Sequence, residues 1–436
     1  MATQPSSPLA ECRHAAGYTQ ETFAETLGVD RTTVGRWERG MQSPQPWQRP
    51  DLATALDISL DHLDDVLRGT RRLPNGSAAV ERCVLGPIGP QPVPWMAMPL
   101  VDGDKRGRPA LVDVISGDDV VHAAIPRLRR ALDRIDLPDD GPTRSYAELA
   151  AEVAGMNEHR LQARYVQLAW RLPGLISELV RATHTGTGRR SRDAAALLTL
   201  ALRAADGIAF KFGYFDLSAR IIDLMRTSAL AAEDPLLLTA VAYVRTEAFF
   251  ATGDLATASR MLVAAADELP AGLGDSAPPV ASYGALHMRA AVVASRAGKP
   301  DTAWDHLDEA RRAARQVPEG VYLGTAFGPS SVRIHELAVA VELGDSPAAV
   351  ERAAAWHPPS HLPAERRSHY YIDLARAELR LGHHQDAYLG LATARKVAPE
   401  HVREHPQVRQ TLSALLRTHG SPDDGLVELA AWARAR

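Results

Sequence analysis

Five glycines recur through the second half of the chain, each between two stretches of helical periodicity and 38 to 46 residues from the next. They are Gly213, Gly253, Gly298, Gly344 and Gly382. A small residue follows each glycine five positions later, namely Ser218, Ala258, Ala303, Ala349 and Ala387. An apolar residue follows nine positions later, namely Ile222, Leu262, Leu307, Ala353 and Leu391. Glycine lets the chain reverse and small residues let helices pack closely, so this pattern predicts repeated antiparallel helix pairs.

A single pair of helices cannot bury its apolar face, so pairs of this kind stack into a superhelix. The pattern resembles the tetratricopeptide repeat, although the units here are longer and less regular than that consensus. Two prolines, Pro270 and Pro399, stand seventeen positions after a glycine and are expected to start the following unit. The alternative is a helical bundle without repeats.

Composition places the chain among cytoplasmic globular proteins. Hydrophobic residues make up 45% and charged residues 23% of its 436 residues, which is ordinary for a soluble protein long enough for about two or three domains. No stretch approaches the roughly 20 apolar residues of a membrane span, and the N-terminus has no apolar core of a secretory signal. The two cysteines, Cys12 and Cys83, lie in different segments, which excludes a disulfide framework.

Changes in composition along the chain divide it into four segments. They are residues 1–70, a domain of five short helices; 71–117, a Pro/Gly-rich linker; 118–190, a helical connector; and 191–436, the helical-repeat domain. The predicted fold class is therefore all-α, with a small N-terminal helical domain joined to a helical-repeat superhelix.

Two local features of the middle segments carry further predictions. Within the linker, the apolar runs 95–101 and 109–115 can pair as a short hairpin. Within the connector, a long helix is expected from Tyr146 to about Ala182, kinked or split at Pro173, because proline removes a helical hydrogen bond.

The most informative stretch, residues 16–44, predicts two short helices joined by a tight turn. Thr19 can cap a first helix whose apolar face includes Phe23, and Gly28 ends that helix. Asp30 can cap a second helix, in which Val34 and Trp37 point inward. Two short helices with a glycine-containing turn, the second opening on polar residues, form a helix-turn-helix.

Residues 7–67 resemble the lambda-repressor-like (Cro-type, xenobiotic-response-element) family of DNA-binding domains. The motif elements are T-Q-E-x-F-A, L-G-V, R-x-x-V-x-R-W-E-R-G and the proline that follows. The resemblance implies that Arg13 and Glu38 form a structural ion pair. It also implies the DNA contacts: Gln20 binds a phosphate and braces the recognition helix, Arg39 contacts the backbone, and Arg31, Thr32, Thr33 and Arg36 reach base edges. Arginine can bind guanine bidentately and threonine can contact a base or a thymine methyl.

The predicted DNA-binding domain is itself acidic. Residues 1–70 hold six arginines and ten acidic residues, and the whole chain has a net charge of −4. Because most non-specific affinity for DNA comes from neutralising phosphates, a single copy of this domain should bind weakly. We therefore expect the protein to act as a homodimer through its helical C-terminal region on a double-stranded operator.

The repeat region predicts an effector-binding surface. In a helical superhelix the first helix of each pair lines the concave face, and counting back from each glycine places seven polar, aromatic or sulfur-containing residues there. These are Tyr243, Glu247, Phe250, Met288, Ser331, His369 and Arg376. Within 325–345, Ser330 or Ser331 is expected to cap a helix. A mixed polar and aromatic face suits a peptide or a small molecule, although several of these residues can serve packing alone.

One motif invites a metal-site interpretation. His401, Glu404 and His405 match H-x-x-E-H, the pattern of inverted zinc proteases. Pro399 and Pro406 leave under two helical turns between them and no third ligand is apparent, so a solvated loop or helix start is favoured. No nucleophile–base constellation stands out either. We predict no catalytic residue, no cofactor and no metal site, and therefore no enzyme.

The whole arrangement resembles regulators that join a lambda-repressor-like domain to tetratricopeptide repeats, including actinobacterial ones. That resemblance implies a sequence-specific transcriptional regulator that senses a peptide or small molecule. The alternative is a DNA-tethered helical scaffold whose repeats bind a protein partner.

Overall fold

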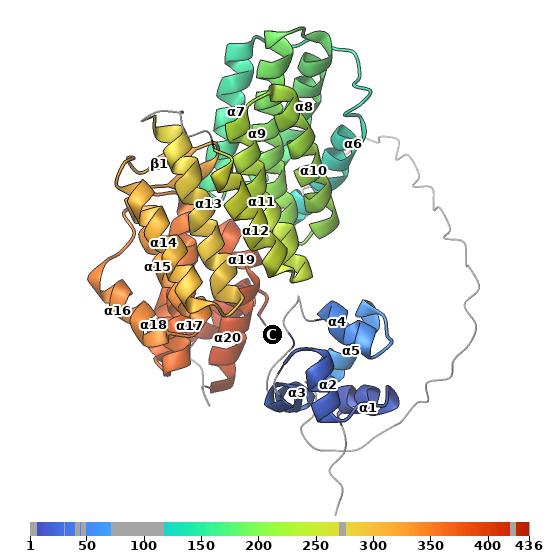
Figure 1. Cartoon of the computed structure of the whole chain (residues 1–436), viewed down its shortest axis with the longest axis vertical. Coiled ribbons are helices and arrows are strands. Elements are labelled where there is room, and N and C mark those ends of the chain that lie inside the picture. Colours follow the sequence, from blue (N-terminus) through green and yellow to red (C-terminus); the bar gives the residue numbers. More distant parts are fainter. Residues whose placement is uncertain are drawn as a thin grey trace, which may run out of the picture. The chain divides into compact units, whose positions relative to one another are not determined.

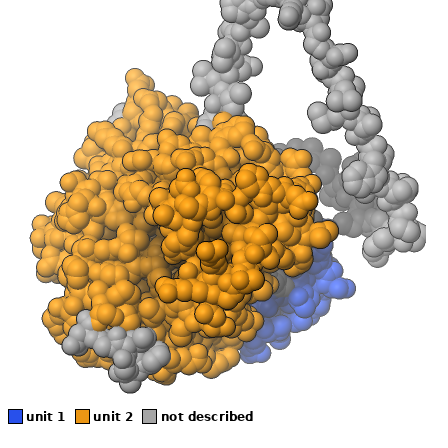
Figure 2. Space-filling model, turned by 90° about the horizontal axis from the view of Figure 1, so that it is seen from above, with its two compact units in different colours: residues 1–115 blue, residues 116–436 orange. Residues whose placement is uncertain are grey.

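The computed structural model describes residues 7–29, 31–39, 44, 49–70, 117–269, 276–418 and 424–435. The chain divides into two compact units, residues 1–115 and 116–436 (Figure 2). The linker hairpin predicted over 95–101 and 109–115 lies outside the described residues, as do Asp30 and Pro270.

The N-terminal unit contains five described helices around one apolar core. They are α1 (Pro8–Ala15), α2 (Gln20–Thr26), α3 (Arg31–Glu38), α4 (Arg49–Ala55) and α5 (Leu60–Thr70). The core side chains come from all five helices and include Leu9, Phe23, Trp37, Leu52 and Leu63. These apolar side chains of the described helices therefore pack together within the unit itself.

The second unit is almost entirely helical (Figure 1). Its first helices are α6 (Gly117–Asp133), α7 (Tyr146–Leu161), α8 (Tyr165–Thr185), α9 (Arg189–Lys211), α10 (Phe215–Ala232), α11 (Pro235–Thr252), α12 (Leu255–Asp267) and α13 (Ala277–Arg296). The others are α14 (Pro300–Ala314), α15 (Pro329–Leu343), α16 (Ser346–Ala355), α17 (Ala364–Leu381), α18 (His384–Val397), α19 (Pro399–Glu404), α20 (Pro406–Thr418) and α21 (Asp424–Trp432). The all-α prediction is confirmed. None of the described helices is both long and apolar enough to cross a membrane.

The repeating glycines mark the reversals between paired helices. All five have a positive φ, between 69° and 85°, and each separates the two helices of a pair: α9/α10, α11/α12, α13/α14, α15/α16 and α17/α18. At Gly344, for example, the N–H of Asp345 donates to the carbonyl of Ala340 at 2.9 Å and closes the helix end. The ten residues five and nine positions after these glycines are all buried, at 3% exposure or less. The sequence pattern therefore reports real helix-pair packing.

A further pair precedes the glycine-marked ones. Helices α7 and α8 are separated at Ala163, which has a φ of 54°, and the N–H of Arg164 donates to the carbonyl of His159 at 2.8 Å, as at Gly344. Sequence analysis expected a kink or a split at Pro173; the split is wrong, because this proline lies inside α8 and the helices separate at Ala163. Alanine stands here where the other pairs have glycine, so the sequence carries no turn signal.

A β-hairpin interrupts the helices between α14 and α15. Strands β1 (Gly320–Tyr322) and β2 (Thr325–Phe327) pair antiparallel, with Val321 opposite Ala326. The two turn residues, Leu323 and Gly324, both have a positive φ, as a tight two-residue hairpin turn requires. This element was not predicted.

The hairpin is held by side chains from helices far away in sequence. Arg203 of α9 donates to the Gly324 carbonyl at 3.3 Å and to the Thr325 hydroxyl at 2.7 Å, and Arg160 of α7 donates to the same carbonyl. Phe327 is fully buried, with its ring against Gly284 of α13. The hairpin therefore fills space among the first helices of the pairs.

Helix α15 is capped by a residue outside it. Glu319 accepts hydrogen bonds from the backbone N–H groups of Ser330 at 2.7 Å and Ser331 at 3.1 Å. The predicted cap by Ser330 or Ser331 is wrong, because the helix begins at Pro329 and neither serine caps it. The hydroxyl of Ser331 instead donates to Glu319 at 2.5 Å.

The end of the superhelix meets its beginning. Lys211, at the end of α9, forms an ion pair of 2.9 Å with Glu365 of α17. The N–H of Val166 in α8 donates to Glu400 of α19 at 2.9 Å, and the N–H of Ala364 donates to Gln162 at 3.2 Å. Residues more than 150 positions apart thus close the stack of helix pairs.

Candidate nucleic-acid interface

Helices α2 and α3 are joined by a turn that the local sequence specifies. The Thr19 hydroxyl accepts from the N–H of Thr22, and the Thr22 hydroxyl accepts from the N–H of Thr19, which forms a capping box at the start of α2. At its end Gly28 has a φ of 63°, and the N–H of Val29 donates to the Ala24 carbonyl at 3.0 Å. Such a turn favours glycine at its left-handed position, and its hydrogen bond sets the direction of the chain between the helices.

Helix α3 has a buried face and an exposed face. Val34 and Trp37 are buried, at 0% and 1% exposure, against Phe23 of α2. Arg31 is exposed at the start of the helix and Thr33 is partly exposed, on the side that the core leaves open. A helix in this setting presents its N-terminal polar residues outward, as the second helix of a helix-turn-helix does.

The structure describes only some of the remaining side chains that were predicted to contact DNA. Arg39 lies just past α3 and is exposed. Thr32 and Arg36 belong to α3, but their side chains lie outside the described residues. The prediction that they reach base edges remains a prediction.

A buried polar network holds α3 against α1 and α2. The Arg13 guanidinium of α1 donates to Glu38 of α3 at 2.6 Å, with both side chains under 9% exposed. Arg13 also donates to the carbonyl of Tyr18 at 2.6 Å. The second oxygen of Glu38 accepts from the Gln20 amide of α2 at 2.6 Å, and since an amide nitrogen has two protons, Gln20 retains a donor for a phosphate. One carboxylate therefore ties three helices together and fixes the direction of α3.

The exposed arginine at the start of α3 is paired with an acidic neighbour. Arg31 lies 2.8 Å from Glu21 of α2, and the two side chains are 63% and 55% exposed. Surface pairs of this kind contribute about 0–1 kcal/mol. Arg31 can therefore leave Glu21 at little cost when a base edge or a phosphate is offered.

The comparisons with known proteins concern this unit. Residues 9–63 match the family described as helix-turn-helix. Over 51 residues the chain is 43% identical to the uncharacterized HTH-type transcriptional regulator YazB of Bacillus subtilis (strain 168). The aligned region covers 12% of this chain and 74% of that protein. The chain belongs to the helix-turn-helix family. No solved structure matches it.

The seven predicted effector residues of this helix-turn-helix protein lie on four helices that are the first of their pairs. Tyr243, Glu247 and Phe250 are on α11, Met288 on α13, Ser331 on α15, and His369 and Arg376 on α17. Tyr243, Met288 and Ser331 are buried, whereas Glu247, Phe250, His369 and Arg376 are partly exposed. Successive first helices pack against each other, α11 on α13, α13 on α15 and α15 on α17, so the partly exposed residues share one layer of the unit.

Arginines that sequence analysis did not select connect these residues. Arg289 of α13 lies 3.4 Å from Glu247 and its guanidinium stands 4.9 Å from the centre of the Phe250 ring. The guanidinium of Arg296, at the end of the same helix α13, stands 4.3 Å from the centre of the same ring. Cations over an aromatic face are attracted by its quadrupole. Both arginines lie on α13, the first helix of its pair, and this position in the repeat could have identified them from the sequence.

The same layer continues onto α15 and α17. Glu342 lies 3.1 Å from Arg376 and 3.6 Å from Arg296. Burial alone would raise the pKa of the Glu342 carboxyl, but Arg296 and Arg376 outweigh it and hold that pKa below its ordinary value. This carboxylate is therefore ionised at neutral pH and bridges two helices.

Three arginines surround Tyr243, and one of them, Arg203 of α9, stands 5.5 Å from its ring centre. Arg366 of α17 donates to its hydroxyl at 3.0 Å, and the guanidinium of Arg289 stands 5.0 Å from its ring centre. Burial would raise the pKa of the Tyr243 phenol, yet Arg366 and Arg289 together lower it. The side chain is part of a positively charged interior rather than a neutral apolar core.

The space beside Tyr243 is small. A cavity of about 10 Å³ lies between α11, α13 and the hairpin, lined by residues that include Tyr243, Ser282, Leu286, Tyr322 and Phe327. That is room for about one water molecule, far below the roughly 300–1,000 Å³ of a typical ligand pocket. A ligand at this point requires the hairpin to move.

Proposed function

We propose that this protein is a sequence-specific DNA-binding transcriptional regulator that reads DNA with α3. The observation that carries the proposal is the network of Arg13, Gln20 and Glu38, which fixes a recognition helix with its polar face outward. Arg31, Thr32, Thr33 and Arg36 contact base edges, while Gln20 and Arg39 contact phosphates. The family match of residues 9–63 supports this assignment.

A binding-selection experiment on random duplex DNA tests the base-reading role. Wild-type protein should enrich one sequence, and Arg31→Ala or Arg36→Ala should lose about 1–3 kcal/mol on that site and relax preference at one base pair. Arg189→Ala removes an arginine that is 88% exposed in the second unit and serves as a charge-matched control. Equal loss of affinity on every sequence would contradict base reading by these residues.

We further propose that the protein binds its operator as a homodimer through the second unit. Residues 1–70 carry six arginines against ten acidic residues, so one copy offers too few phosphate contacts for stable binding. Two copies would read half-sites one helical turn apart, about 34 Å, or a multiple of it. Light scattering of the full chain at micromolar concentration should give a dimer, and a monomer would contradict the proposal.

The second unit is proposed to sense an effector on the layer formed by α11, α13, α15 and α17. Glu247, Phe250 and Arg376, together with Arg289, offer paired charges and an aromatic face to a peptide or small molecule. An effector that also reaches Tyr243 would displace the hairpin, since the cavity lined by that residue is too small for a ligand. The effector must bind the two conformations unequally, with a coupling of about 1–3 kcal/mol, and operator DNA must change effector affinity by the same factor.

This sensing is tested by titrating the selected operator with and without low-molecular-weight extract of the host. The wild-type affinity should change, and Glu247→Gln and Arg376→Gln should abolish the change without altering basal DNA binding. If no fraction alters DNA affinity and both variants regulate normally in cells, sensing at this layer is wrong.

The small cavity specifically favours a second candidate, a DNA-tethered scaffold that binds a protein partner on its outer surface. A partner captured by the full chain and released by surface substitutions, with no effect of small molecules on DNA affinity, would support the scaffold.

A further inference from the structure

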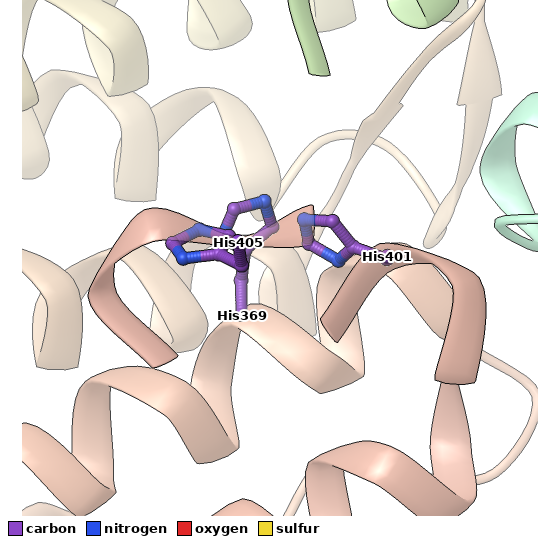
Figure 3. A group of neighbouring side chains, drawn as sticks. All are labelled: His369, His401 and His405. Atoms are coloured by element: carbon purple, nitrogen blue, oxygen red, sulfur yellow. The ribbon is translucent and has the colours of Figure 1, made fainter. Parts of the chain in front are cut away.

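Three histidines converge where α17 meets α19 (Figure 3). His369 comes from α17, His401 from α19, and His405 from the residue after α19. The ring centres of His369 and His401 are 4.5 Å apart, and each lies 5.2 Å from that of His405. One nitrogen of each imidazole lies within 4.8 Å of the corresponding nitrogens of the other two.

This arrangement corrects the interpretation of the H-x-x-E-H motif. Of the two expected alternatives, the helix start is confirmed, since His401 lies in α19, but the segment is not solvated there, because His401 is only 2% exposed. His369 is a third histidine beside the motif that the sequence did not show. Glu404 lies 3.6 Å from Arg409 and 3.9 Å from Arg434. It is held as a structural carboxylate, so the motif does not form a protease site.

Hydrogen bonds define which nitrogen of His401 carries a lone pair. The single hydroxyl proton of Ser368 is donated to the carbonyl of Glu365 at 2.8 Å. Ser368 therefore accepts from Nδ1 of His401 at 2.8 Å, and Nε2 of His401 is the unprotonated nitrogen. Lys211 stands 3.5 Å from Nε2 and occupies the direction in which a ligand would bind.

His405 contributes a nitrogen with no partner. Its Nδ1 is buried and makes no hydrogen bond. Buried polar atoms are nearly always bonded, so an orphaned one calls for an explanation, and a bound ion is one that fits its place beside two other imidazoles.

The carboxylate of Glu365 lies next to the three-histidine cluster. Glu365 lies 3.4 Å from Nε2 of His369 and 2.9 Å from Lys211. Metal-ligating histidines commonly pair their second nitrogen with a carboxylate, which orients the ring and increases its basicity. Glu365 can therefore orient the His369 ring within the cluster.

We propose that His369, His401 and His405 form a binding site for one divalent transition-metal ion of the class that prefers imidazole, such as Zn²⁺. Three imidazoles without a thiolate exclude a site built for soft ions, and the absence of a carboxylate among the three ligands disfavours Mg²⁺ and Ca²⁺. A tetrahedral ion would take a water as its fourth ligand. Bound there, the ion joins α17 to α19 at the point where the superhelix closes.

The experiment uses untagged full-length protein, freed of metal by a chelator that is then removed, and Zn²⁺ as the probe. Calorimetric titration should give one ion per chain at this site, and Co²⁺ should give the absorption of a nitrogen-liganded ion. His369→Ala and His405→Ala should each weaken zinc binding at least 10-fold. His361→Ala, an exposed histidine on another segment, is the matched control and should bind as wild type does.

A second variant separates loss of the site from loss of the fold. Lys211→Met removes the cation beside Nε2 of His401 and releases Glu365 from its ion pair, so zinc should bind several-fold more tightly. Failure of the wild type to bind zinc would overturn the proposal, as would unchanged binding by His369→Ala and His405→Ala. Weaker binding by a folded Lys211→Met protein would contradict the assigned geometry. His383→Ala tests the competing group of Glu378, His383 and Asp386; loss of the zinc site in that variant alone would also overturn it.

Discussion

Substitution of Glu38 by alanine should strongly destabilise the helices α1 to α5. Arg13 and Glu38 are 4% and 8% exposed, and removing one partner of a buried ion pair costs about 3–5 kcal/mol because the other charge is left unpaired. At roughly 0.05–0.15 kcal/mol per residue, a domain of about 60 residues has only about 3–9 kcal/mol of stability. The loss is therefore a large fraction of the total.

Hydrogen exchange measured by mass spectrometry on the full chain gives the magnitude. Peptides from α1 to α3 should lose roughly two to three and a half orders of magnitude of protection in Glu38→Ala, at about 1.4 kcal/mol per factor of ten. Peptides from the second unit serve as the internal control and should not change.

Two further variants distinguish an unpaired charge from lost packing. The double variant Arg13→Met with Glu38→Leu should recover most of the protection, because a buried ion pair is often replaced by apolar side chains without loss. Gln20→Ala should cost only about 1 kcal/mol, the value of one hydrogen bond. Wild-type protection in Glu38→Ala, or a double variant as unprotected as the single one, would refute the reasoning.

Three other predictions concern the second unit. Burial lowers the pKa of His335 to about 3, against about 6.5 in the unfolded chain. As the pH falls from 6.5 towards 3, only the unfolded state gains a proton, so the free energy of unfolding drops by about 1.4 kcal/mol per pH unit. His335→Gln should flatten that part of the pH profile of the urea midpoint, measured in the presence of a chelator. Gly284→Ala should destabilise the unit by about 1–3 kcal/mol, since its Cβ would stand 2.0 Å from the Phe327 ring, and Phe327→Leu should recover part of the loss in thermal unfolding; equal melting of Gly284→Ala and wild type would contradict this packing. Glu319→Ala should cost about 1–2 kcal/mol by uncapping α15, which faster hydrogen exchange at its first turn would report, and unchanged exchange there would argue against the cap.

The predictability of each turn depended on whether glycine occupied the left-handed position. Gly344 and its four counterparts revealed their helix pairs because glycine is the usual residue there. Ala163 and Leu323 adopt the same left-handed region, with φ of 54° and 49°, and neither residue type signals it. The α7/α8 pair and the β-hairpin were missed for this reason.

Contacts between distant residues were the other limit. The cap of α15 comes from Glu319, eleven residues before the first N–H it accepts from, and the third histidine of the His401 cluster comes from His369 on another helix. Local sequence patterns describe neighbours within a helix or turn, so they indicate such sites only where the motif is contiguous, as in the helix-turn-helix.

The closure of the superhelix at Lys211 and Glu365 has a consequence for how this protein can evolve and unfold. In an open solenoid each repeat touches only its neighbours, so units can be gained or lost and terminal units can fray. Here the number of pairs must match the distance that the closing contacts span. Deletion or duplication of one pair would separate Glu400 from Val166 as well. We therefore expect the length of the array to be invariant and the second unit to unfold as a single cooperative body, without the stepwise loss of end repeats.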